Sequence, residues 1–229
     1  MKNLLLLIFA FLLLGPHNVV SQDFTFNNIN ELSGISMREI TAVVRDDDGF
    51  IWAASRTGIL RVTADDYRLY ELPYATTDVM QVKMACRGNL LVAATQNGQI
   101  FRYNPILNKF EQWFTISSLL GNEDWVTNLL IDTDGKVWVS TSVGIFFWTG
   151  EEVVRFFNDI EGFSSIALLE DCQALAFIQS SIYHINTRDC TQHKLHGHFP
   201  YLISSVRYDE RTHRVWIGTY NAGLWKYEL

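Results

Sequence analysis

The stretch that decides the fold is residues 126–146, Val126-Thr-Asn-Leu-Leu-Ile-Asp-Thr-Asp-Gly-Lys-Val-Trp-Val-Ser-Thr-Ser-Val-Gly144-Ile-Phe. It consists of an apolar strand, an acidic turn ending in glycine, a strand with Trp138, a small polar residue, and a glycine turn into a third strand. The same order occurs in residues 40–60, Ile40-Thr-Ala-Val-Val-Arg-Asp-Asp-Asp-Gly-Phe-Ile-Trp-Ala-Ala-Ser-Arg-Thr-Gly58-Ile-Leu. An internal repeat of this kind determines the architecture of a β-rich chain.

Three further copies of the pattern follow, spaced about 40 residues apart. Residues 203–225 keep the tryptophan as Trp216, with a small hydroxyl residue three positions later as in the two copies above. The copy at residues 80–104 has Val92 in the tryptophan position. The copy at residues 163–186 is the weakest, since Ala176 is only approximately in register and no turn glycine follows it.

Each repeat predicts short antiparallel strands, because runs of four to six apolar and β-branched residues are cut by glycine-bearing turns. Asp48-Gly49 and Asp134-Gly135 predict two-residue hairpins with positive φ. A fourth, more polar strand is expected on the solvated outside, at residues 67–71, 110–114 and 153–157.

Four-stranded units of this size cannot bury their own apolar faces and are typical of propeller blades. The sequence therefore predicts an all-β fold, an incomplete β-propeller of about five four-stranded antiparallel blades. The repeated tryptophan is expected to pack between neighbouring blades. The expected blades are residues 40–75, 80–115, 126–158, 163–195 and 203–229.

The first residues indicate a signal peptide. Met1-Lys2-Asn3 is a short positive start, and residues 4–14 form an unbroken apolar run that is too short to span a bilayer. Small residues near Ser21 predict cleavage there, which gives residues 1–21 as the signal peptide and residues 22–229 as the propeller. The protein is therefore expected to be periplasmic or secreted, with no membrane span in this chain.

The composition limits the kinds of partner that are expected. Hydrophobic residues are 48% and aromatic residues 14% of the chain, as in a folded domain. The net charge is −7, and the lysines and arginines are scattered singly, so nucleic acid is not an expected partner. Cys172 and Cys190 could pair in an oxidising compartment, while Cys86 is expected to be a small buried side chain.

The sequence contains no catalytic motif of the Gly-x-Ser-x-Gly, His-Glu-x-x-His or Cys-x-x-Cys type, so neither an enzyme nor a cofactor is expected. Cys190, His193, His196 and His198 lie close in sequence, and a polar loop is favoured over a metal site. The acidic turns lack the full spacing of a calcium loop, so a role in the hairpins is favoured over calcium binding.

Ligand contacts in propellers generally come from two classes of loop on one face. The loops from outer strand to next inner strand hold Tyr74, Asn122, Asp124, Trp125 and Tyr201. The turns between second and third strands hold Arg56, Tyr220 and Asn221. Aromatic faces beside amides and carboxylates suit a sugar, and the alternative for each aromatic residue is packing against the next blade.

The repeat and its lead-in segment carry a family resemblance. The repeat has an Asp-x-x-Gly-Phe-Ile-Trp core at residues 46–52 and a related sequence at residues 209–223. The lead-in segment, Phe24-Thr-Phe-Asn-Asn-Ile-Asn-Glu-Leu-Ser-Gly-Ile-Ser, follows the predicted signal peptide. Together they resemble the two-component regulator propeller repeats, which form the periplasmic part of hybrid histidine-kinase sensors.

This resemblance implies a sensing module, with an oligosaccharide as its expected ligand and a histidine kinase as its output. Such sensors have propellers of about seven blades, followed by an immunoglobulin-like domain, a membrane span and a kinase core. The chain ends in the third strand of a blade, so a truncated product is expected, partnered by the remaining blades or sensor chain, with a possible dimer in the full-length sensor. A stand-alone secreted propeller acting as a protein-interaction scaffold is the alternative.

Overall fold

The structure is a computed structural model that describes residues 28–29, 34, 37, 39–63, 66–73, 81–157, 162–195 and 199–229. The predicted signal peptide and most of the lead-in segment lie outside these residues. The chain divides into two units, Met1–Gly34 and Ile35–Leu229, and every strand belongs to the second. Within the described part of the chain, no helix has both the length and the apolar character needed to cross a membrane.

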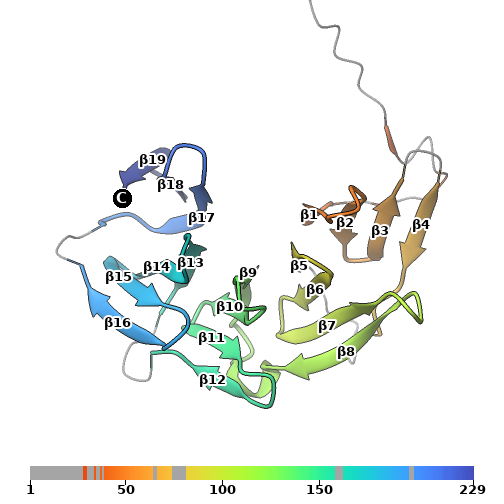
Figure 1. Cartoon of the computed structure of the whole chain (residues 1–229), viewed down its shortest axis with the longest axis horizontal. Helices are drawn as coiled ribbons and strands as arrows, with labels where there is room; N and C mark the ends of the chain where they lie inside the picture. Colours follow the sequence, from red (N-terminus) through yellow and green to blue (C-terminus); the bar gives the residue numbers. More distant parts are fainter. Residues whose placement is uncertain are drawn as a thin grey trace, which may run out of the picture. The chain divides into compact units, whose positions relative to one another are not determined.

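The described residues form five antiparallel sheets that follow one another in chain order (Figure 1). The first sheet contains β1 (Ala42–Arg45), β2 (Ile51–Ser55), β3 (Gly58–Val62) and β4 (Tyr67–Tyr70). The second contains β5 (Val82–Arg87), β6 (Leu90–Thr95), β7 (Gln99–Asn104) and β8 (Lys109–Thr115), followed by the short 3-10 helix η1 (Ser117–Leu119).

The remaining sheets repeat this arrangement. The third contains β9 (Val126–Ile131), β10 (Val137–Thr141), β11 (Ile145–Trp148) and β12 (Val153–Arg155). The fourth contains β13 (Ser164–Leu168), β14 (Gln173–Ile178), β15 (Ser181–Asn186) and β16 (Thr191–Lys194). The fifth contains β17 (Ile203–Asp209), β18 (Arg214–Thr219) and β19 (Leu224–Glu228). The fifth sheet has three strands among the described residues, in line with the expectation that the chain ends in the third strand of a blade.

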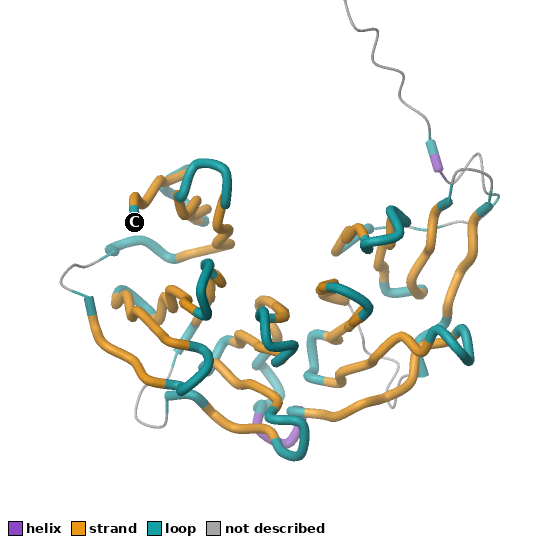
Figure 2. The backbone as a smooth tube through the Cα atoms, in the orientation of Figure 1, coloured by secondary structure: helices purple, strands orange, loops and turns teal. Residues whose placement is uncertain are grey.

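Strand order within each sheet follows the sequence, with short loops between antiparallel neighbours (Figure 2). The first strand of each sheet contacts the first strand of the next, from β1 to β5, β9, β13 and β17. Among the fourth strands, β16 is the most exposed, with all four of its residues in solvent. This arrangement confirms the predicted propeller blades, with first strands inside and fourth strands outside (Figure 1).

The hydrophobic core lies between consecutive sheets rather than within one. Trp52 of the first sheet, 1% exposed, packs in one cluster with Met84 and Phe101 of the second. Trp138 of the third sheet, fully buried, packs with Ile166 of the fourth. The predicted packing of these two tryptophans between blades is confirmed.

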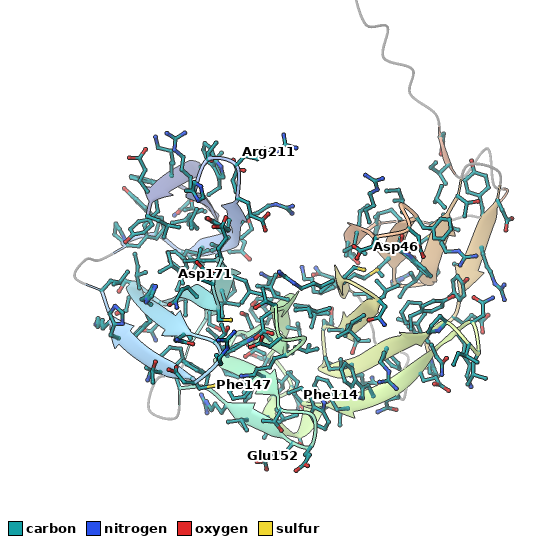
Figure 3. All side chains as sticks on the ribbon, viewed as in Figure 1. Asp46, Phe114, Phe147, Glu152, Asp171 and Arg211 are labelled. Carbon is teal, nitrogen blue, oxygen red and sulfur yellow. The ribbon has the colours of Figure 1, made fainter. Side chains whose placement is uncertain are left out.

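The acidic turns tie each hairpin to its tryptophan. Asp46, labelled in Figure 3, accepts hydrogen bonds from the Phe50 amide at 2.8 Å and from Trp52 Nε1 at 2.7 Å. Asp132 is equivalent and accepts from the Lys136 amide at 2.9 Å and from Trp138 Nε1 at 2.8 Å. Both carboxylates thus satisfy the backbone of a turn and a buried indole together, which is the hairpin role favoured from the sequence.

The predicted two-residue hairpins are wrong by one residue. The Asp46 amide donates to the Phe50 carbonyl at 3.0 Å, and the Gly49 amide donates to the Asp46 carbonyl at 3.0 Å. Three residues therefore separate the paired positions. This is a turn followed by a bulged residue, for which glycine is suited because its φ here is +90°. The turn at residues 132–136 has the same two hydrogen bonds.

The fourth repeat reaches the same fold without glycine. The tryptophan position is occupied by Leu175, one residue before the predicted Ala176, because Leu175 follows Gln173 by two residues as Trp138 follows Lys136. Leu175 is 1% exposed and packs in the core cluster shared with the fifth sheet. Cys172 takes the left-handed conformation that Gly49 and Gly135 take in their repeats, with a φ of +58°. Gln179, in the turn after the second strand, is also left-handed, with a φ of +52°. Asn, Asp and Gly are the usual residues at such φ, which explains why the turns were hard to detect.

The cysteines are free thiols in the structure, so Cys172 and Cys190 form no disulfide. Cys86 is half-buried rather than buried, and burial, with Asp46 and Asp47 nearby, raises the pKa of its thiol to about 11. Of the histidine group, His193 lies beside His184, with the two rings tilted and their centroids 4.9 Å apart. Residues 196 and 198 lie outside the described part, so the metal alternative stays a prediction.

Candidate functional site

One backbone hydrogen bond recurs at the same end of four sheets. The residue after the second strand donates its amide to the carbonyl just before the first strand. The four pairs are Gln96 to Gln81 (3.0 Å), Ser142 to Trp125 (3.0 Å), Gln179 to Phe163 (3.0 Å) and Tyr220 to Leu202 (3.1 Å). This hydrogen bond brings the two classes of loop onto one face, as the sequence predicted.

A pocket of about 430 Å³ opens among these loops. Its lining comes from the second, third and fifth sheets: Gln81, Lys83, Gln96, Asn122, Glu123, Asp124, Trp125, Val126, Thr127, Ser204 and Tyr220. Four of the eight predicted ligand residues lie in it, namely Asn122, Asp124, Trp125 and Tyr220. Its size is within the range of small-ligand sites, and its lining is mostly polar with two aromatic faces.

Asp124 holds the loop in shape. One carboxylate oxygen accepts from the Gly121 amide at 2.7 Å, and the other accepts from Ser142 Oγ at 2.9 Å. Ser142 Oγ also accepts from the amide of Trp125 at 3.1 Å. Asp124 is therefore a positioning residue that fixes the backbone on which Trp125 stands.

The aromatic side chains of the pocket are not buried against the next blade. Trp125 is 44% exposed and Tyr220 is 62% exposed. Phe163 lies between them, with ring centroids 6.5 Å from Trp125 and 6.4 Å from Tyr220. These three rings, from three consecutive sheets, form an aromatic surface that solvent reaches.

The other predicted residues are elsewhere. Arg56 and Asn221 are exposed in their turns but do not line the pocket. Tyr201 does not line the pocket and packs against Trp225 of its own sheet, with ring centroids 5.1 Å apart. Tyr74 lies outside the described residues.

Lys83 is the main residue that the sequence reasoning missed. It is half-buried on β5 and lines the pocket, and burial lowers the pKa of its ammonium group. It was missed because candidates were sought only in loops, whereas Lys83 lies inside the first strand of its blade. Alignment of the strand pairs would have shown a charge where the other repeats have none.

Comparison with known proteins shows the fold. No family model and no curated protein matches the chain. Two extracellular domains from B. thetaiotaomicron, of the hybrid two-component systems BT4673 and BT3049, match with TM-scores of 0.63 and 0.62 at 20% and 16% identity. They cover 91% and 89% of this chain, which spans only 28% and 30% of theirs. The structure of YCF48 bound to a D1 peptide matches with a TM-score of 0.58 at 12% identity. The match covers 83% of this chain and 67% of the YCF48 chain.

At these identities the likeness establishes a shared fold. The first two solved structures are nevertheless of the kind of protein that the repeat and lead-in segment resemble. The third shows that a propeller of this fold is solved with a peptide bound.

Proposed function

We propose that the chain is the extracytoplasmic ligand-sensing propeller of a two-component sensor, and that it binds an oligosaccharide in the pocket beside Trp125. The observation that carries the proposal is the convergence on one pocket of Asn122, Asp124 and Trp125 from one loop and of Tyr220 from the turn of another sheet. The resemblance of the repeat, and the shared fold with extracellular domains of hybrid two-component systems, support the sensing role.

A sugar fits the chemistry of this pocket. The exposed ring of Trp125 offers a face on which the C–H side of a pyranose can stack. Amide side chains from Gln81, Gln96 and Asn122 surround it and can hydrogen-bond to hydroxyl groups. The proposed role is binding without chemical conversion of the sugar.

Binding would be transmitted to a histidine kinase that is not in this chain. The pocket draws residues from the second, third and fifth sheets, so one ligand can contact sheets that are not consecutive. A ligand shifts a conformational equilibrium only by its differential affinity for the two states, and contacts to separate sheets can supply that difference. A periplasmic location follows from the proposal.

A glycan array on the purified chain, followed by calorimetry on the hits, tests the ligand. Trp125→Ala and Tyr220→Ala should each weaken binding by roughly 10-fold, because each removes a stacking face. Asn221→Ala is the matched control, since Asn221 adjoins Tyr220 but lies outside the pocket. A screen without any bound glycan counts against the ligand.

The DNA that follows the codon for Leu229 tests the link to signalling. Further repeats, a membrane span and a kinase core encoded there, or in the adjoining reading frame, support the sensor. The alternative function is that of a secreted protein-interaction scaffold. The solved structure of YCF48 with a bound peptide supports this alternative. A chain that is monodisperse alone, binds no glycan and has no neighbouring kinase gene would favour that alternative.

A further inference from the structure

Lys83 departs from the repeat. It pairs with Ala94 across β5 and β6. The equivalent pairs in the other four sheets are Ala42 with Ala54, Asn128 with Ser140, Ser165 with Phe177, and Ser205 with Gly218. Each of these first-strand residues is small or uncharged, so the blade fold does not require a cation at this position.

The position of Lys83 is fixed by its strand. Val82 is fully buried and Met84 is 7% exposed, and both belong to the core between the first and second sheets. Lys83 itself is half-buried and lines the pocket. Burial lowers the pKa of its ammonium group, which is the direction expected when a cation is partly removed from water without a compensating anion.

The described residues do not neutralise this cation. No hydrogen bond or ion pair joins Lys83 to another described side chain. The Asp124 carboxylate is already engaged by the Gly121 amide and Ser142 Oγ. Glu123 is exposed in the loop and makes no ion pair within the described part of the chain. A partly desolvated ammonium therefore faces a pocket in which a ligand could supply the anion.

We propose that the ligand is an acidic oligosaccharide, whose carboxylate or sulfate group pairs with Lys83 while a sugar ring stacks on Trp125. This inference rests on the proposed function and specifies its ligand class. Because the chain has a net charge of −7, its overall field repels polyanions, so one cation at the pocket favours a short ligand with few charges.

The test compares matched ligands by calorimetry: a uronic-acid oligosaccharide, its carboxyl-reduced neutral counterpart, and a sulfated oligosaccharide of similar length. The wild-type chain should prefer one acidic form over the neutral form by roughly 10-fold or more, as expected for a charge-assisted hydrogen bond. Lys83→Met should lose this preference, because it weakens binding of the acidic form by more than it changes binding of the neutral form. Lys83→Arg should keep it, and added salt should reduce it.

Equal wild-type affinity for acidic and neutral forms would overturn the inference, as would a Lys83→Met variant that weakens both equally. If neutral glycans bind in a manner that depends on Trp125, the sensor function stands and the acidic ligand is rejected. If no glycan binds, both fail. Should Lys83→Met not fold, the salt dependence of the wild-type chain still decides the question.

Discussion

The third and fifth sheets have the same repeat but not the same burial. Trp138 in the third sheet is fully buried, whereas its equivalent Trp216 is only half-buried. Ile145 is fully buried, whereas its equivalent Leu224 is 68% exposed. The third sheet packs against both the second and the fourth, through two separate hydrophobic clusters. The comparison shows that a repeat residue is buried by the neighbouring sheet and not by its own.

The largest expected effect comes from a charge placed at this position in each sheet. Ile145→Lys should destabilise the protein by at least about 3 kcal/mol, because it buries an unpaired ammonium in the core between the third and fourth sheets. Leu224→Lys should change stability by no more than about 0.5 kcal/mol, because that side chain is already in solvent.

Urea unfolding of both variants, followed by tryptophan fluorescence and far-UV circular dichroism, measures the two values. Similar destabilisation at both positions would mean that Leu224 is covered in solution, and the comparison between the two sheets would fail.

A smaller difference is expected at the carboxylates that hold the tryptophans. Asp132→Ala should cost about 1–3 kcal/mol, because it leaves the buried Trp138 Nε1 and two turn amides without their acceptor. The equivalent Asp209→Ala should cost less, since Asp209 is half-exposed and water can replace it. Thermal unfolding of both variants checks the order. A larger loss for Asp209→Ala would show that the fifth sheet is better shielded than its exposures indicate.

The smallest effect is a pH dependence in the fifth sheet. A hydrogen bond from Thr212, assisted by the Arg211 amide and Trp216, lowers the pKa of Asp209 below its ordinary 3.8. A lowered folded-state pKa adds stability that is present above the unfolded pKa and is lost as pH falls through the folded value. Asp209→Asn should therefore flatten the loss of stability between about pH 4 and pH 2. Melting temperatures across this range test it, and an unchanged slope would exclude the contribution.

Much of the fold could be predicted from the sequence, because the same pattern of strands and turns occurs several times along the chain. Trp52 and Trp138 pack between blades as predicted, since an apolar side chain of that size needs a neighbouring sheet to cover it. The predicted length of the hairpin turns was wrong, because an Asp-Gly pair suits a two-residue turn and equally a longer turn with a bulge. The turns of the fourth repeat were hidden because Gln179 and Cys172 adopt φ values for which sequence gives no signal.

The site was predicted only in part. Loop residues such as Trp125 and Tyr220 could be placed on one face, because strand order fixes which loops share an end. The sequence did not indicate which aromatic residues stay in solvent, so Tyr201 and Trp125 looked alike although Tyr201 packs against Trp225. The exposure of an aromatic side chain depends on contacts between sheets, and the sequence of a single repeat does not determine these contacts.

The hydroxyl of Thr41 joins the first sheet to the second: it donates to the Val82 carbonyl at 2.8 Å, and the Val82 amide lies 3.2 Å from the same oxygen. Thr127 does the same between the third and fourth sheets, donating to the Ser164 carbonyl at 2.9 Å. Each of these links joins a repeat to the one synthesised immediately after it. The chain can therefore assemble in the order in which it is synthesised, each repeat docking on a predecessor that is already in place.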